Sequence, residues 1–427
     1  LGLDTDNSTL KISDLNDGTT WPASQVAQRT AGGDKWQAIV VAHRDIWLFG
    51  QQTSEVWYNA GTSPFPFAPI PGAFLEEGIV APFSAQRFGN TVVWLGRSEE
   101  GAGVVYMANG YVPQRISTHA VEFAIQGYAR AGTTITDAVA FTYQEDGHVF
   151  YVLNFPSAKA TWVYDGTTNL WHERGTWNAD KVEYKAWRPQ YHAYAFNKHL
   201  VGDRELGTIY EMGIDKFTDA GGGPIRRLRR TPHVSVEDDW LFYHSLQVIL
   251  ETGVGLASPP VVGGEDPQLM LRWSNNGGHT WGNEHWVSAG KRGEYGTRAL
   301  WRRLGRGYNR VFEVVVSAPV PWRVVGAYMD VARGSAVSRS TGGGNGSVSG
   351  TVLAALFSVD CGRGEQLCEK VGAHVPDGPD GVDWGHGAEY RNTGPRRLSH
   401  ELRRENHDRS HDEFQLDGDA GLDGWRG

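Results

Sequence analysis

Arginine side chains provide the most distinctive chemistry in this sequence. They form two clusters, which contain Arg226, Arg227, Arg229 and Arg230, and then Arg302 and Arg303, with Arg306 and Arg310 close behind. Clustered guanidinium groups bind carboxylates and phosphates well and are enriched at protein interfaces. We therefore predict contact with a protein partner or with DNA at these positions. An exposed loop after the Gly-Gly-Gly-Pro stretch is the simpler interpretation of the first cluster.

Acidic side chains could instead support glycoside hydrolysis, which requires two carboxyl groups about 5–10 Å apart. The available acidic groups are Glu76 and Glu77, and then Glu237, Asp238 and Asp239. Neighbouring residues on a strand point to opposite faces of the sheet, and both groups lie beside turn signals. Solvated strand edges explain these groups better, so we predict no catalytic residue.

Histidine and cysteine residues are too scattered to predict a metal site. The pairs are His192 and His199, His407 and His411, and Cys361 and Cys368. A zinc site requires three or four ligands, and the cysteine spacing fits neither a zinc motif nor a redox motif. The sequence also lacks a phosphate-binding loop, a nucleophile elbow and a dinucleotide fingerprint. We therefore predict no metal and no cofactor.

Residues 274–281 (SNNGGHTW) resemble the Asp-box of sialidase-type propellers, with Asn276 at the position where Asp is usual. In that family the box folds a hairpin away from the active site, so the resemblance implies a structural role. The Asn-Gly-Gly sequence by itself also predicts a tight turn.

The strands that must position these residues are clearest in residues 148–174. Apolar runs at 149–153 and 161–164, and a third run from Leu170, predict three strands of a meander. Asp165-Gly166 is expected to supply the positive φ angles of a tight hairpin. Residues 119–126 fit either a short helix or an irregular connector.

This strand pattern recurs along the chain. Strands that begin at Asp45, Thr91, His148 and His192 are about 45–57 residues apart, close to the length of one propeller blade. A sheet of this size is marginal alone and needs neighbours against its faces. We therefore predict an all-β fold, a β-propeller-like array of short antiparallel meander sheets. A large β-sandwich is the alternative, but it would not require this period.

Composition divides the chain into three regions. Residues 1–240 are predicted to form propeller blades, and residues 241–333 either complete the propeller or form an accessory β-region. Residues 334–427 are rich in Gly, Asp, Arg and His, which predicts a disordered tail or a translation in a shifted reading frame. The first residue is Leu rather than Met, from which we expect that N-terminal sequence has been lost.

The overall charge limits the possible partners. The 427-residue chain has a net charge of −9, so any contact with DNA is expected to be local. Only two cysteines are present, which is typical of a reducing compartment. No apolar run approaches the roughly 20 residues of a membrane helix. We expect a soluble protein that is made in the cytoplasm.

Four segments point to a known family: DIWLFGQQTSEVWYNAG (45–61), TVVWLGRSEEGAGVVYMANGY (91–111), HVFYVLNFPSAKATWVYDGTTNLWHERG (148–175) and LRWSNNGGHTWGNEHW (271–286). They resemble the packaged-DNA stabilisation proteins of short-tailed bacteriophages and prophages, which are also called tail accessory factors or tail hubs. The resemblance covers about residues 10–334. It implies a non-enzymatic virion protein of the phage tail that is assembled in the bacterial cytoplasm.

The same resemblance implies the partners. Such a protein would form a homo-oligomeric ring, a hexamer, below the portal protein, where it closes the channel, stabilises packaged DNA and serves as a platform for the tail needle. Two alternatives come from other classes of protein. One is a sialidase-like glycosidase that uses Glu77, and the other is a glycan-binding propeller without turnover.

Overall fold

The computed structural model describes residues 1–334, apart from residues 30–31, 99–100, 179, 236–238 and 257–263, and the backbone of strand β29 (Ser349–Val352). The predictions for a C-terminal tail, and for Cys361, Cys368, His407 and His411, fall outside the described residues. Glu237 and Asp238 lie outside them as well.

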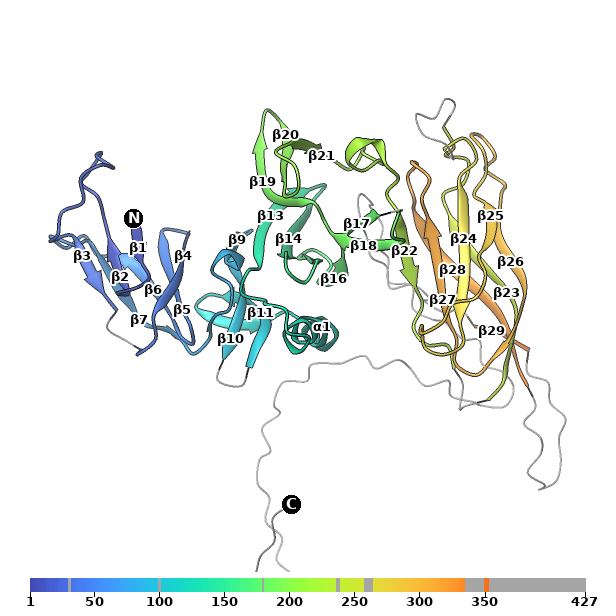
Figure 1. Ribbon diagram of the computed structural model, residues 1–427, viewed down its shortest axis with the longest axis horizontal. Coiled ribbons are helices and arrows are strands. Elements are labelled where there is room, and N and C mark those ends of the chain that lie inside the picture. The colour runs from blue at the N-terminus through green and yellow to red at the C-terminus, as the bar shows by residue number, and fades with distance from the viewer. Residues whose placement is uncertain are drawn as a thin grey trace, which may run out of the picture. The chain divides into compact units, whose positions relative to one another are not determined.

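The described chain is almost entirely β-structure in short antiparallel sheets (Figure 1). Five of these sheets follow one another in sequence order. Their strands are β1 (Gly2–Asp4), β2 (Thr9–Lys11) and β3 (Val26–Gln28); β4 (Trp36–Ala42), β5 (Asp45–Gly50), β6 (Ser54–Asn59) and β7 (Phe67–Leu75); β8 (Gly78–Ile79), β9 (Gln86–Phe88), β10 (Thr91–Ser98), β11 (Gly101–Asn109) and β12 (Val112–Arg115); β13 (Val139–Glu145), β14 (His148–Phe155), β15 (Ala160–Asp165) and β16 (Leu170–Glu173); and β19 (Pro189–Ala195), β20 (Lys198–Asp203) and β21 (Ile209–Met212).

Each of these five sheets shares a hydrophobic core with the next sheet along the chain. The residues that meet in the four successive cores include Leu10 and Leu48, Phe49 and Trp94, Leu95 and Leu153, and Val152 and Val201. On β14, Val152 and Leu153 point to opposite faces of the sheet and are both fully buried. A strand that is buried on both sides requires a neighbouring sheet against each face, as in a propeller.

The turns of the central sheet differ from expectation in one respect. Positive φ angles occur at Gly147, in the turn before β14, and at Asn169, where φ is 59°. The prediction that Asp165-Gly166 supplies them is wrong. Gly166 is needed for space instead, because a Cβ atom there would lie 2.5 Å from the ring of Phe88.

Helix α1 (His119–Arg130) covers the core between the third and fourth sheets. The hydroxyl of Thr118 accepts a hydrogen bond from the backbone N–H of Val121 and caps the first turn. Val121 and Ile125 are buried in the core, and Tyr128 packs against the same core beyond the 119–126 segment that the sequence suggested.

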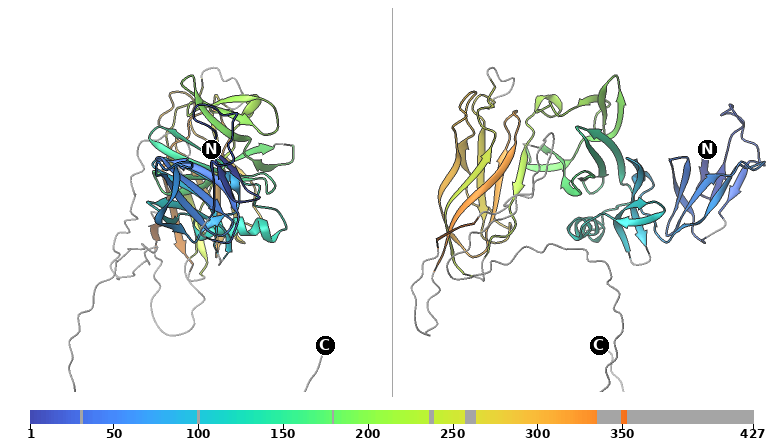
Figure 2. Two further views of the ribbon diagram at one scale, coloured as in Figure 1. Left: turned by 90° about the vertical axis from the view of Figure 1, so that its left-hand side faces the viewer. Right: turned by 180° about the vertical axis from the view of Figure 1, so that it is seen from behind.

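A two-layer sandwich follows the propeller sheets (Figure 2). Before the sandwich, the chain also contains a β-hairpin and two short 3₁₀ turns. The hairpin consists of β17 (Gly175–Asn178) and β18 (Glu183–Ala186), and the turns are η1 (Pro82–Ser84) and η2 (Ala220–Gly222). The two sandwich sheets contain β22 (Arg227–Arg230), β27 (Val311–Val316), β24 (Gln268–Ser274) and β25 (His285–Ser288), and β26 (Ala299–Gly307), β23 (Leu241–Leu250), β28 (Val324–Arg333) and β29.

One continuous core joins the two sandwich sheets. Leu246, Trp301 and Met329 of one sheet pack in it with Leu271 and Phe312 of the other. These side chains occupy the inward face of each strand, and the alternate positions point outward. The register places Arg230 opposite Glu313 on the outward face, whereas Arg227 and Arg229 lie opposite Val316 and Val314 on the inward face.

The shared propeller cores predict a large cost for one tryptophan substitution. Trp94 is fully buried and its ring centroid lies 5.1 Å from that of Phe49 in the preceding sheet. We expect Trp94→Ala to lower the free energy of unfolding by about 3–5 kcal/mol, measured by urea denaturation. Trp286→Ala is the matched control, because Trp286 is 54% exposed. This substitution should lower the free energy of unfolding by about 0.5 kcal/mol or less. Equal losses in the two variants would contradict the stacked-sheet interpretation.

Candidate functional site

The first arginine cluster lies on β22, an edge strand of the sandwich. Arg227 donates hydrogen bonds to the carbonyl oxygens of Val320, at 2.7 Å, and of Ala318. It therefore holds the edge strand to the segment that follows β27. By strand alternation Arg229 lies on the same face as Arg227, and its side chain is half-buried.

Arg230, on the opposite face of β22, pairs with a buried carboxylate of the neighbouring strand β27. Glu313 is fully buried on the central strand β27, and the register places Arg230 on one side of it and Arg272 on the other. Arg230 Nε donates to Glu313 Oε2 at 2.8 Å, and Arg272 Nε donates to Oε1 at 2.6 Å. A buried carboxylate is tolerated only when it is paired and hydrogen-bonded. Both arginines are therefore paired with a buried carboxylate, although the Arg230 side chain is itself 54% exposed. We name Arg230, Glu313 and Arg272 the Glu313 triad.

Arg226 reaches the Glu313 triad and also contacts the β17–β18 hairpin. Its Nη2 lies 3.9 Å from Glu313 Oε1, and its guanidinium carbon lies 4.4 Å from the centre of the Trp177 ring. Arg226 Nη1 donates to the hydroxyl of Tyr184 at 2.9 Å, and that hydroxyl donates to the carbonyl of Arg226 at 3.1 Å. Burial raises the pKa of Tyr184, so the phenol stays a neutral donor.

The second predicted cluster has a different environment. Arg302 and Arg303 are exposed on β26, an edge strand of the other sheet. Arg303 has a φ of 59°, and the β23–β26 register shifts between Tyr243 and Ser245, which marks a bulge. The two predicted clusters thus lie on different sheets and do not form one continuous site.

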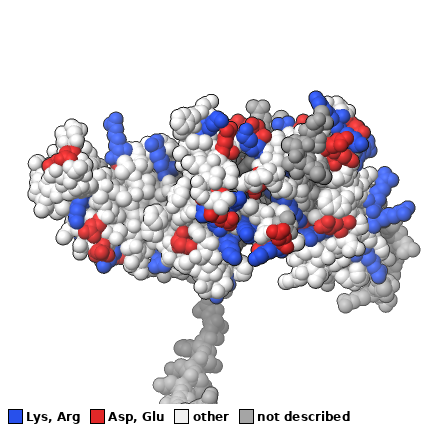
Figure 3. Space-filling view, turned by 45° about the horizontal axis from the view of Figure 1, so that its top comes forward, with Lys and Arg blue, Asp and Glu red and all other residues white. Residues whose placement is uncertain are grey.

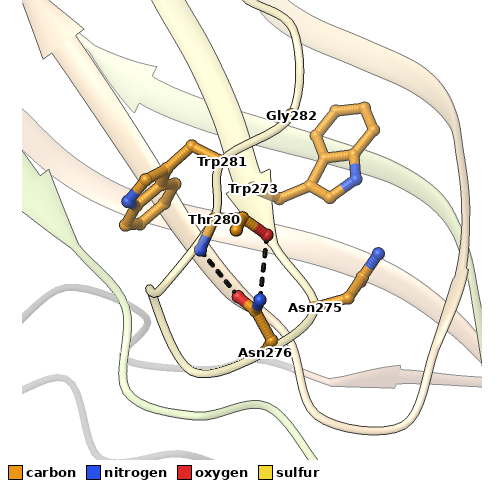
Figure 4. A pocket seen from close by; sticks show the side chains of 6 residues that line it. All are labelled: Trp273, Asn275, Asn276, Thr280, Trp281 and Gly282. Atoms are coloured by element: carbon orange, nitrogen blue, oxygen red, sulfur yellow. Dashed lines mark hydrogen bonds between the residues drawn. The ribbon is translucent and has the colours of Figure 1, made fainter.

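The Asp-box-like segment forms the turn that leaves β24, and its hydrogen bonds explain its sequence (Figure 4). Asn276 Oδ1 accepts from the backbone N–H of Thr280 at 2.9 Å, and Asn276 Nδ2 donates to Thr280 Oγ1 at 2.9 Å. Ser274 Oγ donates to Asn276 Oδ1 and accepts the backbone N–H of Gly278 at 2.8 Å. Gly277 and Gly278 have φ angles of 70° and 94°. An amide at position 276 can therefore support this turn, and it adds a donor that a carboxylate lacks.

The same turn covers the Glu313 triad. The guanidinium carbons of Arg230 and Arg272 lie 5.0 and 4.9 Å from the centre of the Trp281 ring. A hollow of about 280 Å³ lies beside the turn, lined by Trp273, Asn275, Asn276, Thr280, Trp281 and Gly282 (Figure 4).

Arg310 is a buried structural residue that the sequence placed with the exposed clusters. It is 1% exposed and donates to Asn275 Oδ1 at 2.8 Å and to the carbonyls of Leu304 and Arg306 at 2.6 and 2.7 Å. Its guanidinium carbon also lies 4.4 Å from the centre of the Tyr243 ring. Burial lowers the pKa of Arg310. This side chain links the Asp-box-like turn to the β26–β27 connection.

Family models match both halves of this architecture. A model described as Bacteriophage P22 Gp10, beta-propeller, matches residues 3–216. A second model, described as Bacteriophage P22 Gp10, beta-sandwich, matches residues 226–332. The chain belongs to the bacteriophage P22 Gp10 family. A search of curated proteins gives no match to this Gp10-family chain.

These matches confirm two predictions made from the sequence. The resemblance to the DNA-stabilisation proteins of short-tailed phages is confirmed, and so is the all-β fold of short antiparallel sheets with a propeller. The Gp10-family chain is thus a structural protein of the phage tail. The domain limits, and the partner contacts of the six arginines, stay predictions.

Glu76, Glu77 and Asp239 are the acidic candidates that lie within the described residues. Glu76 and Glu77 lie just after β7, and burial, followed by the charge of Glu76, raises the pKa of Glu77. Asp239 forms an ion pair with Arg333. Among the residues that the structure describes, no group of three His, Cys, Asp or Glu side chains is arranged to hold a metal ion.

His192 and His199 form a pair between two propeller sheets. His192 Nε2 lies 2.9 Å from His199 Nδ1, and the two rings have centroids 5.1 Å apart. The rings of Phe141 and Tyr143 pack against His192, with their centroids 6.0 and 5.8 Å from the centroid of its imidazole ring. Burial, followed by the nearby His199, lowers the pKa of His192. The pair is therefore a packing element, and its environment favours the neutral form of His192.

One face of this Gp10-family chain is mixed in charge (Figure 3). On the face shown in Figure 3, Lys and Arg side chains are interspersed with Asp and Glu side chains. Such a surface suits local contacts better than a continuous DNA-binding groove. In the part of the chain that the structure describes, no helix is both long enough and apolar enough to span a bilayer.

The Glu313 triad predicts a large effect of a single isosteric change. Glu313→Gln removes the charge that pairs Arg230 and Arg272 and leaves two guanidinium groups against a neutral amide. We expect the free energy of unfolding to fall by about 3–5 kcal/mol, measured by urea denaturation. Glu251→Gln breaks an exposed pair with Arg323 and should cost about 1 kcal/mol or less. A loss at Glu313 no larger than at Glu251 would show that the triad is unimportant for stability.

The histidine pair predicts a pH dependence of stability. The folded state lowers the pKa of His192 below its ordinary value of 6.5, so below that pH the unfolded chain binds the proton more readily. The free energy of unfolding should therefore keep its full value above about pH 6.5. It should fall as the pH drops from there toward the lowered pKa of His192 in the folded state. Urea midpoints at several pH values measure this, and His192→Phe should reduce the slope. His43→Asn, at an exposed turn, should leave the slope unchanged, and an unchanged slope in His192→Phe would refute the assignment.

Proposed function

We propose that this Gp10-family protein assembles as a hexameric ring below the portal of a short-tailed phage, closes the DNA channel and stabilises the packaged DNA. The ring also serves as the platform for the tail needle. The observation that carries this proposal is that one chain matches both the propeller and the sandwich model of the P22 Gp10 family. Assembly takes place in the bacterial cytoplasm, and the finished protein is part of the virion.

The physical demand on such a ring is stiffness, because packaged duplex pushes outward on whatever closes the channel. Four shared cores connect the five consecutive propeller sheets, and a fifth core joins the two sandwich sheets. The Glu313 triad adds charge-assisted hydrogen bonds across three strands of the sandwich. A role of this kind needs no catalytic group, and we propose that the protein is not an enzyme.

The proposed division of the chain follows the packing. Residues 1–225 form the propeller part, and residues 226–333 form the sandwich part. Of the six candidate arginines, we propose Arg302 and Arg303 as partner contacts because both are exposed. Arg226, Arg227 and Arg230 already bind groups of the same chain.

Assembly on portal rings tests the proposed function. We expect the full chain to co-sediment with purified portal rings, to appear six-fold in electron micrographs, and to reduce the nuclease sensitivity of DNA in filled heads. Portal rings mixed with an unrelated propeller of similar size serve as the control. A well-folded full chain that neither binds the portal nor protects the DNA would refute the proposal.

A further inference from the structure

One end of the sandwich exposes aromatic and basic side chains together. We name this group the aromatic–arginine surface, and it consists of Trp240, Phe242, Arg302, Arg303, Arg306 and Tyr308. Trp240 precedes β23 and Tyr308 follows β26, while Phe242 and Arg306 are direct partners across these two strands. Trp240, Phe242 and Tyr308 are 37%, 39% and 41% exposed.

The parts of this surface are held in place before any partner binds. The ring centroids of Trp240 and Tyr308 are 3.7 Å apart, and the guanidinium carbon of Arg306 lies 4.6 Å from the centre of the Trp240 ring. Arg303 adopts a positive φ of 59° at the β23–β26 bulge, which is costly for a residue with a side chain. Bulges redirect side chains at functional surfaces, so the bulge gives a reason for this conformation.

Edge protection explains only part of this surface. β26 is an edge strand, and charged side chains on an edge prevent unwanted strand pairing. Exposed Trp, Phe and Tyr side chains have the opposite effect, since they favour association. Trp, Tyr, Phe and Arg together are the composition of protein interfaces, where aromatic and arginine side chains contribute most of the binding energy.

The positive charge of this surface suits an acidic partner. Arg302, Arg303 and Arg306 form no ion pair with any carboxylate of the described residues, and the nearby Asp239 is already paired with Arg333. The sequence itself contains a complementary region. Residues 226–334 have 14 Lys and Arg against 10 Asp and Glu, whereas residues 1–225 have 16 against 24.

We propose that the aromatic–arginine surface of one copy binds the acidic propeller part of the next copy, head to tail. The inference rests on the proposed ring, because a heterologous contact of this kind closes into a ring when the rotation per subunit allows it. The net charge of −9 favours a protein partner over a DNA duplex. Each copy would then contribute its aromatic–arginine surface to one contact and its acidic propeller part to another.

Charge reversal with a matched control tests this contact. Arg302→Glu with Arg306→Glu should raise the concentration needed for half-maximal ring assembly by about tenfold or more, measured by light scattering after size exclusion. Lys291→Glu with Arg292→Glu changes the charge equally at exposed positions before β26 and should assemble like the natural protein. Thermal melts confirm that both variants fold. Assembly of the wild-type chain should weaken from about 50 mM to about 500 mM salt.

A cross-linking experiment is independent of those variants. Tyr308 is replaced by the photo-reactive p-benzoylphenylalanine, and labelled and unlabelled full-length copies are mixed before irradiation. Cross-links to residues 1–225 of the other copy support the proposal, and cross-links to the portal or to DNA overturn it. Equal assembly of the Arg302/Arg306 variant and the wild type, or equal loss in both variants, also overturns it. A wild-type chain that forms no ring on the portal would instead refute the proposed function.

Discussion

Small sheets that cannot bury their apolar faces alone are the constraint on which this structure depends. Each propeller sheet has only three to five strands, and its stability comes from the core that it shares with the next sheet. The fourth sheet illustrates this, because Val152 packs toward the fifth sheet and Leu153 toward the third. Stiffness follows directly, since moving one sheet would expose the cores on both of its faces.

Arginine has two separate roles in the sandwich. Arg227 and Arg310 donate hydrogen bonds to backbone carbonyl oxygens. Arg230 and Arg272 donate theirs to the carboxylate of the buried Glu313. A charged group inside a protein persists only when it is paired or hydrogen-bonded, and the buried Glu313 and Arg310 both meet that requirement. The arginines on β26 have a different environment, because they lie on the outer face of an edge strand beside aromatic side chains.

The Asp-box-like turn connects these two roles. Its own hydrogen bonds fix the turn around Asn276, while its Trp281 lies over Arg230 and Arg272. Asn275 in the same turn accepts a hydrogen bond from Arg310. A short segment with a strong local preference therefore organises long-range contacts that its own sequence does not encode.

The local and repeating features of this protein could be predicted from its sequence. The spacing of aromatic strands and turns predicted an all-β chain of small meander sheets, because alternation and turn chemistry act over a few residues. Four long segments also pointed to the family that the models match. The turn at Asn276 to Gly278 was predicted correctly for the same local reason.

Which arginines face solvent depends on how distant strands pair, and the sequence did not reveal it. Alternation shows which residues of a strand share a face, but not which strand lies opposite. Arg230 and Glu313 are 83 residues apart in sequence, and Arg272 and Glu313 are 41 apart. The single acid in the run VFEVVV at β27 was a signal of a buried charge, yet its partners depended on the pairing of three distant strands. Strand pairing arises from the packing of the whole sandwich, so the division between structural and exposed arginines could not be read from local sequence.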